Sequence, residues 1–266
     1  MDLKLNGKIA IVTGASTGIG FACSKALYEE GVSLVMVARD QDRLQQASDT
    51  IRSGYSKEEA ARIVLVAGDM MESETVRQAV NAAIEHFGRI DILINNAGNA
   101  SFGPFFELSD EAFLDAWQLK LLGYMRMVKE TAPHMIKQRD GRIINIVGKA
   151  GRTPTPGYLP GSTANAAILN FTRGISSELA ASNVRINSIS PGATETDRVI
   201  RYTKGLAEQK GTNVESQRSS MSATIPIGHM VSPDEIAAMA LLLVSDRVPS
   251  VTGTEIIIDG GETPGV

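Results

Sequence analysis

Short, nearly continuous apolar runs alternate with longer amphipathic stretches along most of the chain. The apolar runs are rich in Ile and Val and span residues 8–13, 33–38, 62–67, 90–95, 142–147, 185–190 and 255–259. Strands of this kind are buried on both faces, as in a parallel sheet covered by helices. Apolar residues recur at helical spacing in the stretches between them, among which are 72–87, 112–138, 164–181 and 233–245. The pattern predicts one α/β domain over residues 1–266, with a doubly wound, mainly seven-stranded parallel sheet flanked by helices.

Glycine and capping residues mark several expected helix ends. Gly31 and Gly88 each follow a helical stretch, where a left-handed residue commonly ends a helix. Ser232 and Pro233 precede two acidic residues, an order typical of a helix N-terminus. Residues 193–226 break the alternation, because they are polar and contain at most two short helical fragments. A long insertion of this kind is either functional, here as a substrate wall, or a surface loop without a role.

Composition narrows the class of protein. Of the 266 residues, 43% are hydrophobic and 21% are charged, as in an ordinary globular domain. The net charge of −4 argues against a nucleic-acid surface. The single cysteine, Cys23, excludes an internal disulfide and fits a reducing compartment. The polar start of the chain and the absence of a long apolar run predict neither a signal peptide nor a membrane span, so we expect a cytoplasmic protein.

A glycine-rich turn follows the first predicted strand and opens a helix. It reads TGASTGIG over residues 13–20, with glycines at Gly14, Gly18 and Gly20. Glycines let the backbone turn tightly and approach a pyrophosphate, which the N-terminus of the following helix attracts. A glycine turn alone is a weak signal, but its position between a strand and a helix predicts a nucleotide site.

Further motifs follow in order along the chain. Asp69 follows the third strand, residues 95–98 read NNAG, residues 190–192 read SPG, and residues 251–253 and 259–261 read VTG and DGG. Together with the glycine turn, these motifs resemble the short-chain dehydrogenase/reductase family over nearly the whole chain. The resemblance implies a Rossmann-type fold, a dinucleotide cofactor, a small-molecule carbonyl or alcohol substrate, and a homotetramer or homodimer.

The end of the second strand distinguishes NADP(H) from NAD(H). Folds that bind NAD usually place an acidic side chain there, but this chain has Ala38 followed by Arg39, and arginine can pair with a 2′-phosphate. Asp40 either weakens that preference or caps the next helix, and the alternative for Arg39 is a solvated loop charge. We therefore predict NADP(H), with NAD(H) as the alternative. The residues predicted to bind it are Gly14, Ser16, Thr17, Gly18, Ile19, Gly20, Arg39, Asp69, Met70, Asn95, Asn96, Ala97, Gly98, Asn165, Pro191, Gly192 and Thr194.

The catalytic positions depart from the family's pattern. In the family that the chain resembles, a serine follows the fifth strand, a tyrosine and a lysine lie on a later helix as YxxxK, and an asparagine lies in the long middle helix. The tyrosine exchanges a proton with the substrate oxygen, and the lysine holds the cofactor ribose and supports the tyrosine with its charge. The alignment places the serine, tyrosine, lysine and asparagine positions at Gly148, Gly161, Asn165 and Lys120. All of the expected side chains are therefore replaced.

Other side chains can supply the chemistry. Tyr158 precedes Gly161 by three residues and shares its helix face if the helix extends that far, although Pro160 suits a helix start. Lys149 adjoins the vacant serine position, and Lys120 projects from the middle helix. Each has a simpler alternative, namely loop packing for Tyr158, a solvated charge or a phosphate contact for Lys149, and a carboxylate partner for Lys120. We predict these as the catalytic residues.

The sequence leaves several functions open. The first is a divergent NADP(H)-dependent oxidoreductase that transfers hydride between the nicotinamide and a carbonyl or secondary alcohol. The second is an NADP(H)-binding protein without redox activity, such as a sensor, and the third is a lyase or isomerase on the same fold. No metal site is predicted, because the histidines His86, His134 and His229 show no ligand spacing.

The substrate itself is not identified by the sequence. Its wall is expected at residues 193–226, with Phe102 and Phe105 nearby. Arg198 and Arg201 in that segment either favour an anionic substrate or lie on a solvated helix.

Overall fold

Seven parallel strands form the centre of the molecule. The computed structural model describes residues 2–197, 199–200, 203–204, 207 and 211–263. The strands pair in the order β3-β2-β1-β4-β5-β6-β7, which confirms the predicted doubly wound, Rossmann-type sheet. Their bounds are β1 Ile9–Thr13, β2 Ser33–Ala38, β3 Ile63–Ala67, β4 Ile92–Asn95, β5 Gly141–Ile146, β6 Val184–Pro191 and β7 Glu255–Ile258.

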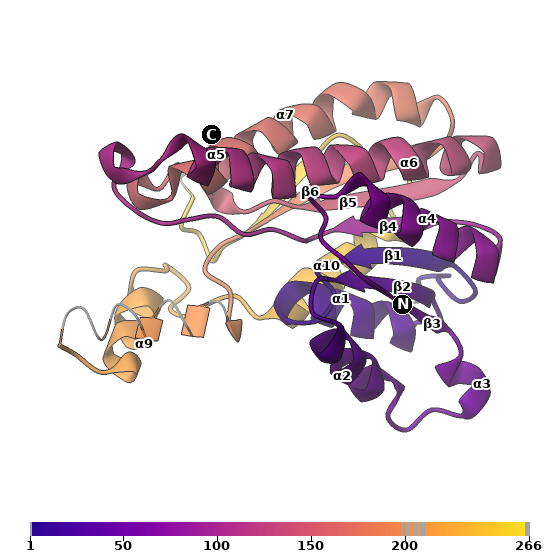
Figure 1. Ribbon diagram of the computed structural model, residues 1–266, viewed down its shortest axis with the longest axis horizontal. Coiled ribbons are helices and arrows are strands. Elements are labelled where there is room, and N and C mark those ends of the chain that lie inside the picture. The colour runs from indigo at the N-terminus through magenta and orange to yellow at the C-terminus, as the bar shows by residue number, and fades with distance from the viewer. Residues whose placement is uncertain (1, 198, 201–202, 205–206, 208–210, 264–266) are drawn as a thin grey trace.

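Helices cover both faces of the sheet (Figure 1). One face is covered by α1 Gly18–Glu29, α2 Gln41–Arg52 and α10 Pro233–Val244. The other face is covered by α4 Ser73–Phe87, α6 Gly123–Gln138 and α7 Leu159–Ala180. The shorter helices are α3 Lys57–Ala60, α5 Asp110–Ala116 and α9 Val214–Ala223, and α9 lies away from the sheet in Figure 1. No helix among the described residues is both long and apolar enough to span a membrane.

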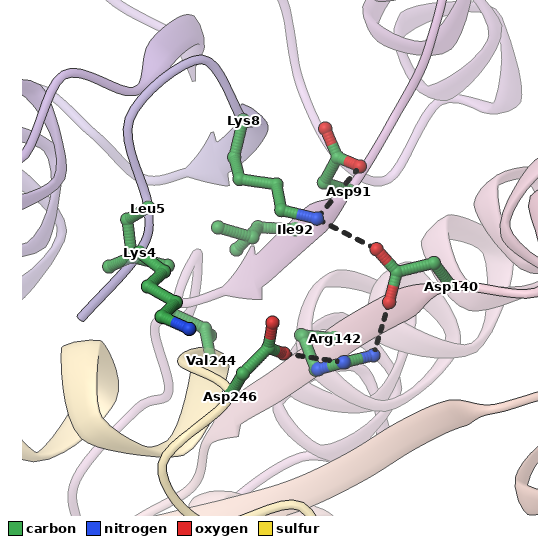
Figure 2. Close-up of a pocket in the computed structure, with 9 residues that line it drawn as sticks. All are labelled: Lys4, Leu5, Lys8, Asp91, Ile92, Asp140, Arg142, Val244 and Asp246. Carbon is green, nitrogen blue, oxygen red and sulfur yellow. Dashed lines mark hydrogen bonds and ion pairs between the residues drawn. The ribbon is translucent and has the colours of Figure 1, made fainter.

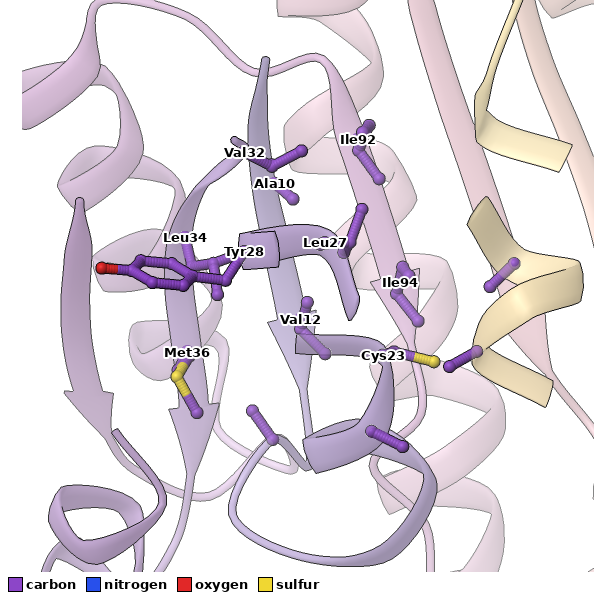
Figure 3. Close-up of a cluster of buried hydrophobic side chains, with 14 of the residues drawn as sticks. Ala10, Val12, Cys23, Leu27, Tyr28, Val32, Leu34, Met36, Ile92 and Ile94 are labelled. Atoms are coloured by element: carbon purple, nitrogen blue, oxygen red, sulfur yellow. The ribbon is translucent and has the colours of Figure 1, made fainter. Parts of the chain in front are cut away.

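The core between the sheet and α1 explains the apolar runs of the sequence. Figure 3 shows the Tyr28 ring of α1 over Leu34 of β2, whereas Leu27 of α1 points toward β4, and all three residues are buried. Cys23 lies in the same cluster, where burial raises the pKa of its thiol to about 12. The only cysteine of the chain is therefore a core residue.

The middle helix is not continuous. The stretch at 112–138 was expected to form one helix, but a π-helical turn, Trp117–Leu122, separates α5 from α6. A π turn holds one more residue than an α turn, and apolar spacing does not reveal this difference. The turn contains Lys120 and lies against α7. Such turns occur frequently at functional sites.

Charged side chains fill the amino-terminal edge of the sheet, opposite the ends where a ligand binds in this fold (Figure 2). Lys8 Nζ lies 2.7 Å from Asp140 and 3.8 Å from Asp91, and these residues precede β1, β5 and β4. Arg142 pairs with Asp140 and Asp246 at 2.9 Å each. This network joins three strand starts to the end of α10, so we assign it a structural role.

Candidate active site

The glycine turn is held by the neighbouring strand end. Thr13 Oγ1 accepts hydrogen bonds from the backbone N–H groups of Asn96 and Ala97 at 3.0 and 3.1 Å. The Asn96 amide donates to the carbonyl oxygen of Gly14 at 3.1 Å. Gly14 has φ +66°, and a Cβ there would lie 2.8 Å from the Asn96 amide nitrogen, so glycine is required on both grounds. These contacts bring the TGASTGIG and NNAG motifs into one structure.

A cleft of about 370 Å³ opens beside this turn. The predicted cofactor residues that line it are Gly14, Ser16, Thr17, Gly18, Ile19, Arg39, Met70, Asn96, Ala97 and Gly98. Residues that line it but were not predicted are Ala38, Asp40, Arg43, Gly68, Asn99, Leu119, Thr196 and Asp197. The start of α1, whose N-terminal dipole favours anions, borders the cleft at Gly18.

Two arginines stand at the edge of the cleft that follows β2. The Arg39 side chain is 63% exposed and its guanidinium lies 3.8 Å from Asp69, and Arg43 of α2 lies 3.4 Å from Asp40. Asp40 caps α2 by accepting a hydrogen bond from the Arg43 N–H, which matches the capping alternative. Arg43 was missed because its only signal is a second arginine one helical turn after Arg39. The glycine turn, the helix N-terminus and the two arginines fit a dinucleotide with a 2′-phosphate.

Several predicted cofactor residues lie outside the lining of this cleft. A Cβ on Gly20 would overlap the Gly14 carbonyl, so Gly20 serves the packing of α1 on the turn. Asp69 accepts a hydrogen bond from the Met71 N–H at 2.9 Å, and Asn95 is buried and donates to Asn145 at 3.0 Å. Asp69 thus holds the backbone after β3, and Asn95 links β4 to β5.

The remaining predicted cofactor residues lie at the end of β6 and on α7. Thr194 Oγ1 donates to the Gly192 carbonyl at 3.0 Å, and Gly192 follows Pro191 at the end of β6. Asn165 is 2% exposed on α7, and its Oδ1 has no hydrogen-bond partner among the described residues. Their contact with a cofactor stays a prediction.

Tyr158 fills the space beside Gly161. It stands at the N-cap of α7, and a Cβ on Gly161 would overlap its ring. The ring stacks on Phe102 at a centroid distance of 4.6 Å. Burial, and less strongly the neighbouring Tyr158, raises the pKa of the Tyr124 hydroxyl, which donates to the Ile146 carbonyl. Tyr158 therefore packs against the vacant tyrosine position, where a bulkier residue at 161 would displace it.

Lys120 and Asn165 meet at the end of β5. The Lys120 ammonium donates to the carbonyl oxygen of Val147, and its aliphatic stem lies 3.1 Å from where a Cβ of Gly98 would be. A Cβ on Gly148 would lie 3.1 Å from the Asn165 amide nitrogen, and Gly148 has φ +125°. An ammonium and an amide thus face adjacent residues at the vacant serine position.

Lys149 lies on the other side of Gly148, in the short helical turn Lys149–Gly151. Its ammonium is 2.5 Å from the carboxylate of Glu262, in the segment after β7. Sequence reasoning missed Glu262, because nothing in its local pattern indicates that the end of the chain returns to β5.

The expected substrate wall is described only in part. Arg198 and Arg201 lie outside the described residues. The described part of 193–226 includes α9 and contributes Thr196 and Asp197 to the cleft. Phe105 is 53% exposed in a short turn before α5. No group of three His, Cys, Asp or Glu side chains suited to a metal ion occurs among the described residues.

Comparisons with known proteins agree on one family. The model of the short chain dehydrogenase family matches residues 8–206. Oxidoreductase UcpA of Salmonella typhimurium is 32% identical over 262 residues, which cover 98% of this chain and 96% of that protein. NADPH-dependent reductase BacG of Bacillus subtilis is 31% identical over 258 residues, with 97% and 98% covered. The crystal structure of L-sorbose reductase from Gluconobacter frateurii, complexed with NADPH and L-sorbose, has a TM-score of 0.94 at 30% identity and full coverage of both chains.

Proposed function

The chain belongs to the short-chain dehydrogenase family, and on that premise we propose that it is an NADP(H)-dependent oxidoreductase acting on a small carbonyl compound or secondary alcohol. When bound, NADP(H) would supply or accept the hydride at its nicotinamide ring. The turn at 14–19 would hold the pyrophosphate, while Arg39 and Arg43 would hold the 2′-phosphate. The relatives named as NADPH-dependent or complexed with NADPH support this choice of cofactor.

The observation that carries the proposal is the position of Tyr158. Its ring occupies the space that Gly161 leaves open, so the chain retains a phenol beside the position where the resemblance places one. A phenol can donate a proton to a carbonyl oxygen during reduction and take it back during oxidation. We assign Tyr158 this role, with Phe102 holding the ring by stacking.

Lys120 and Asn165 support the same assignment. The resemblance places an asparagine at 120 and a lysine at 165, and this chain has the two residue types exchanged. One ammonium and one amide are therefore retained, and they face Val147 and Gly148 from the π turn and from α7. We propose that Lys120 supplies positive charge near the reacting oxygen and that Asn165 binds a cofactor hydroxyl through its unpartnered Oδ1.

A second candidate is a protein that binds NADP(H) without redox turnover. The observation in its favour is the pair Gly148 and Gly161, neither of which has a side chain that can transfer a proton. The third candidate is a lyase or isomerase on the same fold. The second candidate predicts binding of NADPH with no net oxidation, whereas a lyase or isomerase, with or without a bound nucleotide, predicts product formation with no net change in the cofactor.

We also propose that the protein acts as a homodimer or homotetramer. Leu114 of α5 and Met125 and Ile136 of α6 are exposed apolar side chains on neighbouring helices, and a second copy would cover them. Light scattering during size exclusion would give the mass, and a monomer would contradict this part of the proposal.

The experiment that tests the function combines binding with turnover. Cofactor fluorescence titrations should give tighter binding for NADPH than for NADH, and Arg39→Ala should weaken NADPH binding by about tenfold or more, because charge-assisted hydrogen bonds are lost. The same sample, offered a panel of small ketones and aldehydes, should consume NADPH. Binding without consumption in either direction would favour the second candidate, and no binding would contradict both.

A further inference from the structure

An ion pair joins the end of the chain to the candidate active site. The Lys149 ammonium lies 2.5 Å from Glu262 Oε1, and the side chains are 26% and 13% exposed. Lys149 follows Gly148 after β5, whereas Glu262 follows β7. Both residues therefore lie at the carboxyl ends of the strands, where ligands bind in this fold.

The second oxygen of the Glu262 carboxylate lacks a partner. Oε2 is buried and accepts no hydrogen bond from any described residue. It lies against the end of β6, because a Cβ on Gly192 would be 2.8 Å from it. An unpartnered buried carboxylate oxygen is costly. Its presence beside Gly192 points to a hydrogen-bond donor that a ligand brings.

The segment that carries Glu262 is fixed by Asp259. The Asp259 carboxylate accepts hydrogen bonds from the N–H groups of Gly261 and Thr263 at 3.0 and 2.7 Å. Burial raises the pKa of Asp259, but these hydrogen bonds and the charge of Lys149 outweigh it, so the pKa is lowered overall. The segment is thus tied down at both sides of Glu262, and its carboxylate is held in place.

The ion pair places a hydrogen-bond donor, the Lys149 ammonium, next to an acceptor, the Glu262 carboxylate. An ammonium has three N–H donors, of which the contact with Glu262 uses one, and a carboxylate only accepts. The matching ligand group has an acceptor next to a donor, as a carbonyl with a hydroxyl on the neighbouring carbon has. We propose that Lys149 and Glu262 form a subsite for this hydroxyl, so that α-hydroxycarbonyl compounds are the preferred substrates. The inference rests on the proposed oxidoreductase function.

A matched pair of ketones tests the subsite. Hydroxyacetone and 2-butanone differ in having a hydroxyl or a methyl group at the same position. We expect kcat/KM with NADPH to favour hydroxyacetone by about tenfold or more in the wild type, since hydrogen bonds to charged groups discriminate on this scale. Because the hydroxyl also makes the carbonyl more reactive, the criterion is the change in this ratio on substitution. Glu262→Gln should reduce the ratio at least about fivefold, since the amide replaces the charged acceptor.

Glu255→Gln is the matched control. Glu255, the first residue of β7, pairs with Arg152 and accepts a hydrogen bond from Ser190, but it does not contact Lys149 in the described structure. This variant should keep the wild-type ratio. Because Glu262 lies against Gly192, a predicted cofactor residue, the ratio for Glu262→Gln is measured at saturating NADPH, whose affinity is determined by fluorescence titration. Lys149→Met provides a second variant if Glu262→Gln does not fold, and it should lower the ratio similarly.

The outcomes separate the two proposals. Turnover of both ketones with a ratio that Glu262→Gln and Lys149→Met leave unchanged would overturn the subsite alone. An unchanged ratio in Glu255→Gln with a reduced ratio in Glu262→Gln supports it. NADPH binding with no turnover of any carbonyl would contradict the oxidoreductase function and, with it, the subsite.

Discussion

At the residue scale, the candidate site contains a phenol, an ammonium and an amide, although the aligned positions lack the side chains expected there. Gly161 has no side chain, yet the Tyr158 ring lies where its Cβ would be. Lys120 and Asn165 provide an ammonium and an amide from exchanged positions, close to Val147 and Gly148. Tyr158 therefore depends on the missing side chain at Gly161 for its space, and we expect a paired exchange of Lys120 and Asn165 to be less harmful than either single replacement.

The exchange of Lys120 and Asn165 gives a prediction for a double-mutant cycle. Lys120→Asn and Asn165→Lys should each lower kcat by about 10²–10³-fold, because one removes the charge and the other buries a second one nearby. The double variant should recover at least about tenfold over the weaker single variant, since one ammonium and one amide are again present. Steady-state kinetics with NADPH measure this coupling. Additive losses in the double variant would contradict the exchange.

Many residues of the cofactor cleft could be predicted from the sequence, whereas the places of Arg43 and Glu262 and the packing of Tyr158 could not. Gly14 and Asn96 lie in local motifs whose spacing carries the information. Arg43 and Glu262 do not, because each reaches the site through the path of a helix or of the chain end. Tyr158 was predictable only as a residue near a vacant position, and its stacking on Phe102 required the structure.

At the scale of elements, strands were predicted more closely than helices. Strands buried on both faces appear as short, nearly continuous runs of Ile and Val, and the predicted and observed strands overlap throughout. The helical period does not distinguish an α turn from the π turn Trp117–Leu122. The start of α7 at Leu159 also lies five residues before the predicted stretch, because Pro160 occupies the first turn. The irregular turn and the early start together position Lys120 and Tyr158.

Two exposed glycines provide tests of a helix C-cap and of helix propensity. Gly88 caps α4 with φ +77°, whereas Gly174 lies within α7, and a Cβ would have open space at both. Gly88→Ala should lower the free energy of unfolding by about 1–2 kcal/mol, because a side chain disfavours the left-handed region. Gly174→Ala should raise it by about 0.5–1 kcal/mol through helix propensity. Denaturant unfolding of both variants measures the opposite signs, and equal signs would contradict the assignment.

At the scale of the whole molecule, chemistry and stability lie at opposite edges of the sheet. The carboxyl ends of the strands carry the cleft and the catalytic candidates, whereas the amino-terminal edge carries the charge network of Lys8, Asp91, Asp140 and Arg142. Arg185 lies nearby, where burial lowers the pKa of its guanidinium to about 10, and it donates to the carbonyls of Leu243 and Ser245. Lowering the pH should therefore reduce the stability of the fold through the amino-terminal edge of the sheet, and should change turnover through the carboxyl edge.

Asp140 provides the test of the amino-terminal edge. Burial raises its pKa, but the hydrogen bond from Lys8 and the charges of Arg142 and Lys8 outweigh this, so the pKa is lowered in the folded state. A lowered pKa contributes stability that is fully present above the unfolded value of about 3.9 and is lost as the pH falls through the folded value. In Asp140→Asn, the free energy of unfolding should fall less steeply than in the wild type as the pH is lowered from about 5 to about 2. Asp49→Asn, on the exposed face of α2, is the control and should keep the wild-type slope.

The most direct test of the oxidoreductase function follows the hydride itself. Wild-type protein is given NADPH carrying deuterium on the transferable face of the nicotinamide, together with hydroxyacetone, and the alcohol product is analysed by mass spectrometry. We predict one deuterium per product molecule, and a rate about 10²–10⁴-fold lower in Tyr158→Phe with NADPH affinity unchanged, because the proton donor is lost. Product without deuterium, or an undiminished rate in Tyr158→Phe, would contradict the account.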